Sequence, residues 1–282
     1  MKQKHVIITG GHSGIGLELT KLILKDGHKV GLILRNESTL KEAKQKFEQL
    51  GYNNVEFLVA DLCRQEDVLK VARSITNTWQ KVDILFNNAG VLLGELTFSP
   101  QQNEMHYEVN TLAPYLLATN LYQSLHDAEG AVVVNTVTDG LNMMKSLKAE
   151  TLIHPSKFKK LFGAYLQSKL ALALLMNDLA INWKPEKIRI LHVAPGGNKT
   201  KLTSGNGMPS LLKPIVKLFY KDPVAGAKLL YNAAFEDQFD NKTGVFIQKN
   251  KIENLKLIIG NDQKLVLLKG VSSTTGKRHF SI

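Results

Sequence analysis

Cysteine is nearly absent from this chain of 282 residues, and no apolar run approaches the length needed to cross a membrane. A single thiol, Cys63, cannot form an internal disulfide, which is typical of a reducing compartment. The first five residues lead directly into an apolar run, so we expect no signal peptide. Together these features predict a cytoplasmic protein.

Arginine-rich runs and stripes of alternating basic and aromatic residues are also missing, although the net charge is +11. The 36 Lys and Arg are spread along the chain, so we do not expect a nucleic-acid partner. Peripheral contact with an anionic membrane stays open, while a basic surface that attracts an anionic cofactor is the simpler explanation. No metal site is predicted.

Internal repeats, low-complexity tracts and linkers are absent too, and the chain alternates short apolar runs with longer stretches of helical periodicity. Strands that are apolar throughout and separated by helices predict a parallel sheet covered on both faces. We expect an α/β fold, a single doubly wound Rossmann domain with a parallel seven-stranded sheet and helices on both faces. The expected strands are His5–Thr9, Lys29–Leu34, Val55–Ala60, Ile84–Asn87, Ala131–Thr136, Ile188–Val193 and Gly244–Gln248. The expected helices are Leu17–Lys25, Ser38–Leu50, Arg64–Trp79, Glu104–Leu125, Gly163–Asn182 and Pro223–Phe235.

Two segments fit this alternation poorly. Residues 139–162 join a strand to a helix over a long path, which suits the lining of a substrate pocket; the alternative is a surface loop. Residues 1–248 are expected to form the catalytic domain, and residues 249–282 an extension of the same domain without an assigned role. Within that extension the apolar runs 255–259 and 265–268, separated by Gly260-Asn261-Asp262, indicate a hairpin.

A glycine-rich turn follows the first expected strand and opens the first expected helix. Strand, tight turn and helix N-terminus together place several backbone N–H groups where a pyrophosphate can bind. The alternative is a strand–helix turn without a ligand. The predicted cofactor-binding residues of this turn are Gly10, His12, Ser13, Gly14, Ile15 and Gly16.

Tyr165 and Lys169 are four residues apart within an expected helix, so their side chains share one face. A free tyrosine has a pKa near 10, and a neighbouring ammonium would lower the pKa of the phenol towards neutrality. Such a pair suits proton transfer in catalysis. The alternative is an exposed pair on a helix surface.

These motifs occur in an order that resembles the short-chain dehydrogenase/reductase family over residues 5 to about 248. Besides the glycine turn and Tyr165-x-x-x-Lys169, the resemblance rests on Asn87-Asn88-Ala89-Gly90, Asn110 and Pro195-Gly196. The sequence around Tyr165, the long segment before it and Asp222-Pro-x-x-Gly-Ala are similar to the retinol-dehydrogenase-like branch.

The resemblance implies a role for each matching catalytic residue. Tyr165 would exchange a proton with the substrate oxygen, and Lys169 would lower the pKa of the phenol and hold the ribose of the nicotinamide. Asn110 would hold a water that links Lys169 to solvent; the alternative is a polar residue that distorts its helix.

The remaining implied residues would bind the cofactor. Asp61, with Leu62, would contact the adenine, unless Asp61 caps the next helix. Thr200 would contact the nicotinamide side, unless it only turns its loop. A strand-to-loop turn is the alternative for the stretch that follows the fourth strand. The other implied cofactor-binding residues are Asn88, Ala89, Gly90, Pro195, Gly196 and Asn198.

One catalytic position departs from the family pattern. The family usually has a serine at the end of the fifth strand, and alignment on Asn135 places Thr138 there. Threonine keeps the hydroxyl donor, although its extra methyl restricts χ1. A shift of one residue would instead place Val137 at this position and remove the hydroxyl.

The choice of cofactor depends on the end of the second strand. An NAD site places a carboxylate about 20 residues after the glycines, but Leu34 stands at the strand end and Arg35 follows. A guanidinium suits a 2′-phosphate, so Arg35 favours NADP(H) over NAD(H), and Asn36 beside it is a further predicted cofactor-binding residue. Glu37 is the competing carboxylate, at a position that also suits the first turn of a helix.

The predicted function is hydride transfer between a nicotinamide and a carbonyl or alcohol substrate, of the carbonyl-reductase or alcohol-dehydrogenase type. Apolar residues in the two variable loops favour a hydrophobic substrate. The alternative is a dinucleotide-binding regulator with little turnover. The expected helices at 104–125 and 163–182 suit a homodimer or homotetramer, unless their apolar faces are buried within one subunit. The apolar loop residues are Leu141, Met143, Met144 and Leu147, then Leu202, Met208, Leu211 and Leu212.

Overall fold

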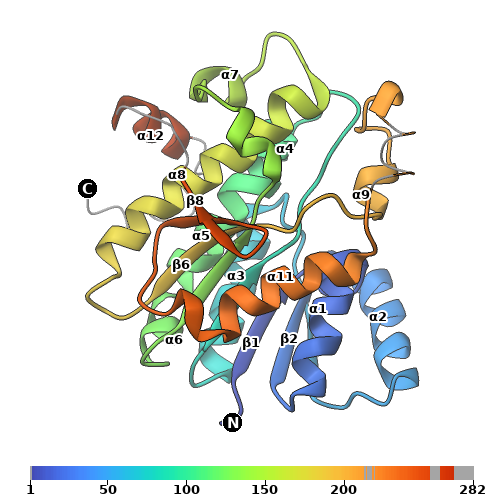
Figure 1. Cartoon of the computed structure of the whole chain (residues 1–282), viewed down its shortest axis with the longest axis vertical. Coiled ribbons are helices and arrows are strands. Elements are labelled where there is room, and N and C mark those ends of the chain that lie inside the picture. Colours follow the sequence, from blue (N-terminus) through green and yellow to red (C-terminus); the bar gives the residue numbers. More distant parts are fainter. Residues whose placement is uncertain (1, 213, 215–217, 219, 255–260, 270–282) are drawn as a thin grey trace.

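The computed structural model describes residues 2–254, except 213, 215–217 and 219, and residues 261–269 (Figure 1). Its centre is one sheet with the strand order β3-β2-β1-β4-β5-β6-β7-β8. The first seven strands are parallel, as the apolar runs predicted. Their bounds are β1 His5–Thr9, β2 Lys29–Leu34, β3 Val55–Val59, β4 Ile84–Asn87, β5 Val132–Thr136, β6 Arg189–Ala194 and β7 Val245–Gln248.

An eighth strand, β8 (Lys251–Glu253), pairs antiparallel with β7 and was not predicted. Lys249 and Asn250 both have positive φ, which closes a tight hairpin of the handedness that twisted strands favour. All three residues of β8 are exposed, and the alternation of polar and apolar residues in Lys251-Ile252-Glu253 is too short to predict a strand.

Helices cover both faces of the sheet. Alternate strand residues enter two separate cores, so that Ile7 packs with α3, α5 and α8 while Ile8 packs with α1, α2 and α11. Figure 1 shows α1 and α11 side by side. The bounds are α1 Gly14–Lys25, α2 Glu37–Gln49, α3 Gln65–Thr78, α5 Ala113–Asn120, α8 Leu166–Asn182 and α11 Pro223–Phe235.

The helix expected at 104–125 is not continuous. It divides into α4 (Met105–Tyr107), a π-helical turn η1 (Glu108–Leu112), α5, and α6 (Tyr122–His126). A π turn inserts an extra residue and rotates its side chains relative to a regular helix, and here it contains Asn110. A second π turn, η3 (Lys160–Tyr165), precedes α8, and Gly163 within it has non-helical φ and ψ. Both π turns therefore carry predicted catalytic residues.

The long segment between β5 and α8 contains a 3-10 turn η2 (Asp139–Met143) and a short helix α7 (Ala149–Ile153). After β6 the chain forms α9 (Lys201–Ser204) and a 3-10 turn η4 (Ser210–Leu212). These two segments lie at the top and the upper right of Figure 1, above the carboxyl ends of the strands.

The prediction of a hairpin in the tail is wrong for its second half, because residues 261–268 form a helix, α12 (Asn261–Leu268). Its first half, 255–259, lies outside the described residues. Leu267 is fully buried, and its carbonyl oxygen accepts a hydrogen bond from the Tyr107 hydroxyl. Four consecutive apolar residues fit a strand or a helix equally well, and packing against α7 and α8 decides for the helix here.

Candidate active site

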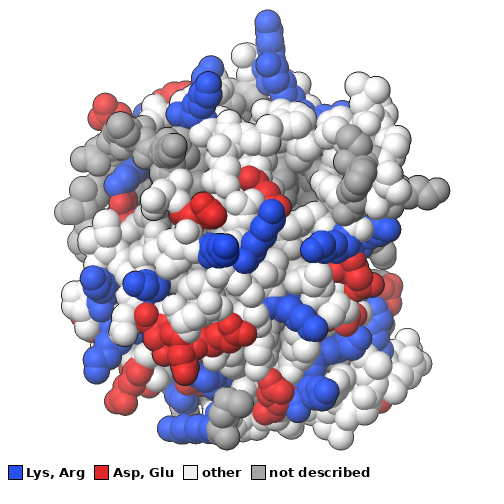
Figure 2. Space-filling view, viewed as in Figure 1, with Lys and Arg blue, Asp and Glu red and all other residues white. Residues whose placement is uncertain are grey.

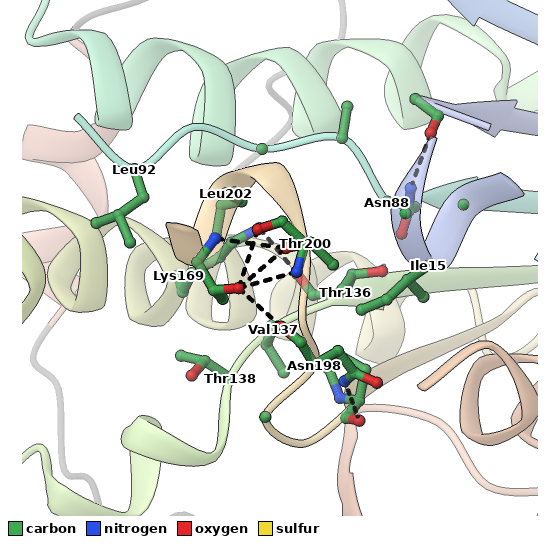
Figure 3. Close-up of a pocket in the computed structure, with 18 of the residues that line it drawn as sticks. Ile15, Asn88, Leu92, Thr136, Val137, Thr138, Lys169, Asn198, Thr200 and Leu202 are labelled. Atoms are coloured by element: carbon green, nitrogen blue, oxygen red, sulfur yellow. Dashed lines mark hydrogen bonds between the residues drawn. The ribbon is translucent and has the colours of Figure 1, made fainter. Parts of the chain in front are cut away.

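A cavity of about 640 Å³ opens at the carboxyl ends of β1, β4, β5 and β6. Its walls come from the glycine turn, these strand ends, the start of α8 and the loop after β6, as Figure 3 shows for part of the lining. In a doubly wound sheet this edge is where ligands bind. Lys169, Thr138, Asn198 and Thr200 surround one space in Figure 3.

The glycine turn has the backbone shape that a pyrophosphate site requires. Gly10 and Gly14 have φ of 67° and 52°, and a Cβ on Gly16 would lie 2.3 Å from the Gly10 carbonyl oxygen. Ser13 is the N-cap of α1 but makes no side-chain cap, and the first turn of α1 has no acidic residue. The helix therefore presents uncapped N–H donors to the cavity, so these residues fit the diphosphate of a dinucleotide.

Asn88 and Ala89 hold the glycine turn in place from the neighbouring strand end. The Thr9 hydroxyl accepts hydrogen bonds from the backbone N–H groups of Asn88 and Ala89, both at 3.0 Å. The Asn88 side chain donates to the Thr9 carbonyl oxygen at 3.1 Å. Asn88, Ala89 and Gly90 all line the cavity, and their contact with the cofactor stays a prediction.

Tyr165 and Lys169 both lie in the cavity wall and are almost fully buried. The Lys169 Nζ donates to the Thr136 carbonyl oxygen at 2.9 Å, and burial lowers the pKa of Lys169 to about 8. The expected decrease in the pKa of Tyr165 is not found. Burial and the neighbouring Tyr220 raise the pKa of the phenol to about 12, because burial penalises the charged phenolate.

Val137 and Thr138 both line this cavity, but only Thr138 presents a hydroxyl group to it. The Val137 side chain is 3% exposed and packs in a hydrophobic core, and its N–H continues the ladder to the Val193 carbonyl oxygen. The Thr138 Oγ1 accepts a hydrogen bond from the Gly140 N–H at 3.3 Å, which leaves the hydroxyl hydrogen available for a substrate oxygen. The alignment that places Thr138 at the usual serine position is therefore the one that fits the geometry.

Asn110 lies behind the cavity wall and does not line it. Its Oδ1 accepts from the Val91 N–H at 2.8 Å, and its Nδ2 donates to the Val91 carbonyl and the Ser168 hydroxyl. A Cβ on Gly90 would lie 3.0 Å from the Asn110 Oδ1 and 3.3 Å from the Lys169 Nζ. The side chains of Asn110 and Lys169 therefore lie on the same side of Gly90. The water-holding role of Asn110 stays a prediction.

Four predicted cofactor residues lie outside the cavity, beyond the ends of β2 and β3. Arg35 is 73% exposed in its side chain, and its Nε contacts the Asp61 carboxylate at 3.2 Å. Burial alone would raise the pKa of Asp61, but hydrogen bonding with Cys63 and the charge of Arg35 lower it overall. Asn36 caps α2 by accepting from the Thr39 N–H at 2.9 Å, and Leu62 packs against the core.

The loop after β6 approaches the glycine turn from the other side. Asn198 organises it, since its side chain donates to the Pro195 and Gly196 carbonyls and accepts from the Gly226 N–H. Thr200 caps α9 and forms a capping box with Thr203, as its loop-turning alternative suggested. A Cβ on Gly14 would lie 3.2 Å from the Thr200 methyl carbon. Thr200 therefore turns its loop and also lines the cavity, and its contact with the nicotinamide side stays a prediction.

Two features of the site were missed by the sequence reasoning. Lys46 extends from α2 to the glycine turn, where its Nζ donates to the His12 carbonyl oxygen at 3.4 Å. His106 packs edge-on against the Tyr165 ring, bonds to the Glu104 carboxylate through Nδ1 at 2.6 Å, and accepts from the Leu93 N–H through Nε2. Lys46 had no signal beyond its charge, and Glu104 and His106 were two of several polar residues in their expected helix.

Among the described residues, no helix has both the length and the apolar character of a membrane span. Within the same part of the chain, no group of His, Cys, Asp and Glu side chains could hold a metal ion.

The chain is similar in sequence and in fold to known proteins. Mouse retinol dehydrogenase 14 is 28% identical over 270 residues, covering 90% of this chain and 80% of that protein. A Pseudomonas aeruginosa RhlG/NADP active-site complex superposes with a TM-score of 0.70 at 21% identity, over 88% of this chain and 94% of that one. A Brucella melitensis 3-ketoacyl-(acyl-carrier-protein) reductase complexed with NADH gives a TM-score of 0.68 at 22% identity, over 87% and 96%.

The sequence pattern of the short chain dehydrogenases matches residues 4–149, which is more than half of the chain. The fold, the glycine turn and the order of the motifs agree with that match. This chain belongs to the short-chain dehydrogenase family, and its sequence is similar to the retinol dehydrogenases within it.

Proposed function

We propose that this protein is an NADP(H)-dependent oxidoreductase that interconverts a carbonyl group and an alcohol on a hydrophobic substrate. The family makes it a dinucleotide-dependent oxidoreductase; the 2′-phosphate, the type of substrate and the cytoplasmic location are our inference. The observation that carries the proposal is the meeting of Tyr165, Lys169 and Thr138 in the same cavity as the glycine turn.

The residues have distinct tasks in this reaction. A bound nicotinamide would supply or accept the hydride. Tyr165 carries the proton that the substrate oxygen gains during reduction, and its raised pKa keeps that proton on the phenol until the oxygen becomes basic. Thr138 donates a second hydrogen bond to that oxygen as its charge develops, which is stronger in a buried site than in water.

Lys169 supplies to this reaction an ammonium group that can lose its proton near neutral pH. With a pKa of about 8, it is close to losing its proton at neutral pH. Its partner is a backbone carbonyl, so within the described residues no carboxylate neutralises it. The phenol and the lysine therefore line one cavity with pKa values displaced in opposite directions, which is typical of proton-transfer sites.

The substrate side of the cavity is apolar. Leu92, Leu166 and Met208 are buried around Tyr165 in a separate hydrophobic cluster. The partly buried residues that complete this cluster are Met144, Leu161, Leu202, Leu212 and Tyr220. The whole cluster includes four of the loop residues that favoured a hydrophobic substrate in the sequence, namely Met144, Leu202, Met208 and Leu212. The name of the mouse relative, a retinol dehydrogenase, supports an apolar alcohol.

The proposal is tested by oxidation of NADPH and of NADH with a series of linear aldehydes of increasing chain length. We expect turnover with NADPH, rising with chain length until the apolar cavity is filled. Tight binding of NADPH without turnover of any carbonyl or alcohol would favour the alternative, a dinucleotide-binding regulator.

A further inference from the structure

The net positive charge of this protein is concentrated in two segments, although the 36 Lys and Arg themselves are spread along the chain. Residues 140–165 and 196–221 together contain ten lysines and a single acidic residue, Glu150. The rest of the chain contains 26 basic and 24 acidic residues and is close to neutral. Nearly all of the net charge of +11 therefore belongs to these two segments.

Seven of these ten lysines have described side chains, and all seven are exposed. Within the described part of the chain, none of the seven forms an ion pair with a carboxylate. Figure 2 shows side chains of Lys or Arg, in blue, that project from the top of the molecule, where Figure 1 places the loop after α7. Uncompensated charge of one sign repels itself and attracts an anionic partner. The seven are Lys145, Lys148, Lys157, Lys159, Lys160, Lys199 and Lys221.

The same two segments also expose large apolar side chains. Met143 and Phe162 are 68% and 57% exposed, and Leu211 and Leu218 are 87% and 74% exposed. Lysines interleaved with exposed apolar side chains are typical of surfaces that bind the interface of a membrane, where apolar groups insert and lysines remain at the headgroups.

Both segments border the mouth of the cavity and touch each other there. The Lys160 Nζ donates to the Asn206 carbonyl oxygen at 3.2 Å, which joins the two segments. Leu161 and Phe162 line the cavity from one segment, and Leu202 and Met208 from the other. The two segments therefore supply cavity wall as well as exposed lysines and apolar side chains, and we call their described exposed surface the rim of the candidate active site.

We propose that this rim docks onto the surface of an anionic lipid bilayer, so that the mouth of the cavity faces the lipid. The docking follows from charge and exposure alone; its purpose, the entry of an apolar substrate from the bilayer, rests on the proposed function. A lipid surface explains the exposed Leu211 and Leu218, for which a nucleic-acid backbone has no complementary group. Neither segment contains an arginine, the residue that most often contacts nucleic acid.

Docking is tested by sedimentation of the full chain with vesicles of phosphatidylcholine, alone or with an equal amount of phosphatidylserine. We expect binding to the anionic vesicles only, weakening as salt is added. The double variant Lys157→Glu/Lys159→Glu should lower the partition coefficient by at least about tenfold. The control Lys184→Glu/Lys242→Glu changes the net charge by the same amount at two exposed positions. These positions lie near the amino ends of β6 and β7, away from the cavity at the carboxyl ends, and this control should bind like the unmodified chain.

The apolar contribution has its own matched pair. Leu211→Ser should weaken vesicle binding several-fold, whereas Ile181→Ser, which removes a side chain 72% exposed on α8, should not. Equal effects of rim and control variants, or the absence of binding to anionic vesicles, would overturn the proposal. Tighter binding to a duplex oligonucleotide than to the vesicles would overturn it as well, because it would assign the lysines to nucleic acid.

An activity assay separates this proposal from the proposed function. With a short water-soluble aldehyde, Lys157→Glu/Lys159→Glu should turn over at the unmodified rate, and it should lose rate only when a long aldehyde is supplied in anionic vesicles. Vesicle binding without turnover of either aldehyde would refute the proposed function and leave the docking intact. Turnover of both aldehydes at the same rates in the unmodified chain and in Lys157→Glu/Lys159→Glu would refute the docking and leave the proposed function intact.

Discussion

Arg35 and Asp61 form an ion pair across the ends of β2 and β3, with the Arg35 Nε 3.2 Å from the Asp61 carboxylate. The two residues were predicted separately, one for the 2′-phosphate and one for the adenine. Only the Nε makes this contact. The two terminal guanidinium nitrogens, which carry four of the five N–H donors, do not contact Asp61. Asp61 therefore contacts the guanidinium through one of its three nitrogens only.

Arg35→Ala should weaken the binding of NADPH by about 10- to 100-fold and that of NADH by much less, because only NADPH offers a phosphate to a charged donor. Dissociation constants for both cofactors measure the difference. Glu37→Gln is the matched control, since Glu37 is the competing carboxylate for an NAD ribose. An equal loss for both cofactors in Arg35→Ala, or a selective loss of NADH in Glu37→Gln, would contradict the preference for NADP(H).

Lys46→Met should weaken both cofactors by a few-fold, with an effect that shrinks at high salt. The Lys46 ammonium lies at the His12 carbonyl of the glycine turn and adds positive charge where the phosphates would bind. Lys44→Met, on the exposed surface of the same helix, should leave binding unchanged. Equal effects of the two substitutions would mean that Lys46 acts only through the net charge.

Thr138→Val should lower kcat/KM by about 100-fold, because it removes a hydroxyl donor from the substrate oxygen while nearly preserving shape. Thr138→Ser should keep most of the activity, since serine retains the donor. Binding of NADPH should be the same in all three proteins. If valine at this position were as active as threonine, the oxygen would not be held by residue 138.

Lys169 should make the stability of the cofactor-free protein depend on pH between about 8 and 10. Its folded-state pKa of about 8 lies below that of an unfolded lysine, so folding releases a proton in this range and stability rises with pH. The rise is on the order of 2 kcal/mol. Above this range the raised pKa of Tyr165 acts in the opposite direction.

Urea unfolding at several pH values measures this rise, with Lys169→Met as the comparison. The substituted protein has no charge to bury and should lack the increase between pH 8 and 10. Parallel pH profiles for the two proteins would show that Lys169 is not buried in the way the structure indicates.

The sequence predicted the part of the molecule in which local pattern and tertiary structure agree. Strands buried on both faces are apolar without interruption, so β1, β2 and β4 lie within the predicted bounds. Gly10 and Gly14 predicted a turn that only glycine tolerates well, and both have positive φ. The separation of Tyr165 from Lys169 predicted one helix face, and both residues line the cavity.

The sequence could not predict features that depend on distant partners. Asn110 interrupts its helix because Val91 and Ser168, far away in sequence, hold its side chain. The pKa of Tyr165 depends on burial, which spacing along a helix does not reveal. The basic rim was hidden because its lysines come from two segments that only the fold brings together.

The central claim is that the Tyr165 phenol exchanges its proton with the substrate in the cavity above the glycine turn. Tyr165→Phe removes the hydroxyl and little else, so the direct measurement is NADPH oxidation with an aldehyde by this variant and by the unmodified chain, together with the NADPH dissociation constant of each. We predict a loss of kcat of at least about 100-fold with NADPH binding unchanged within a few-fold. Equal rates in the two proteins would contradict the account.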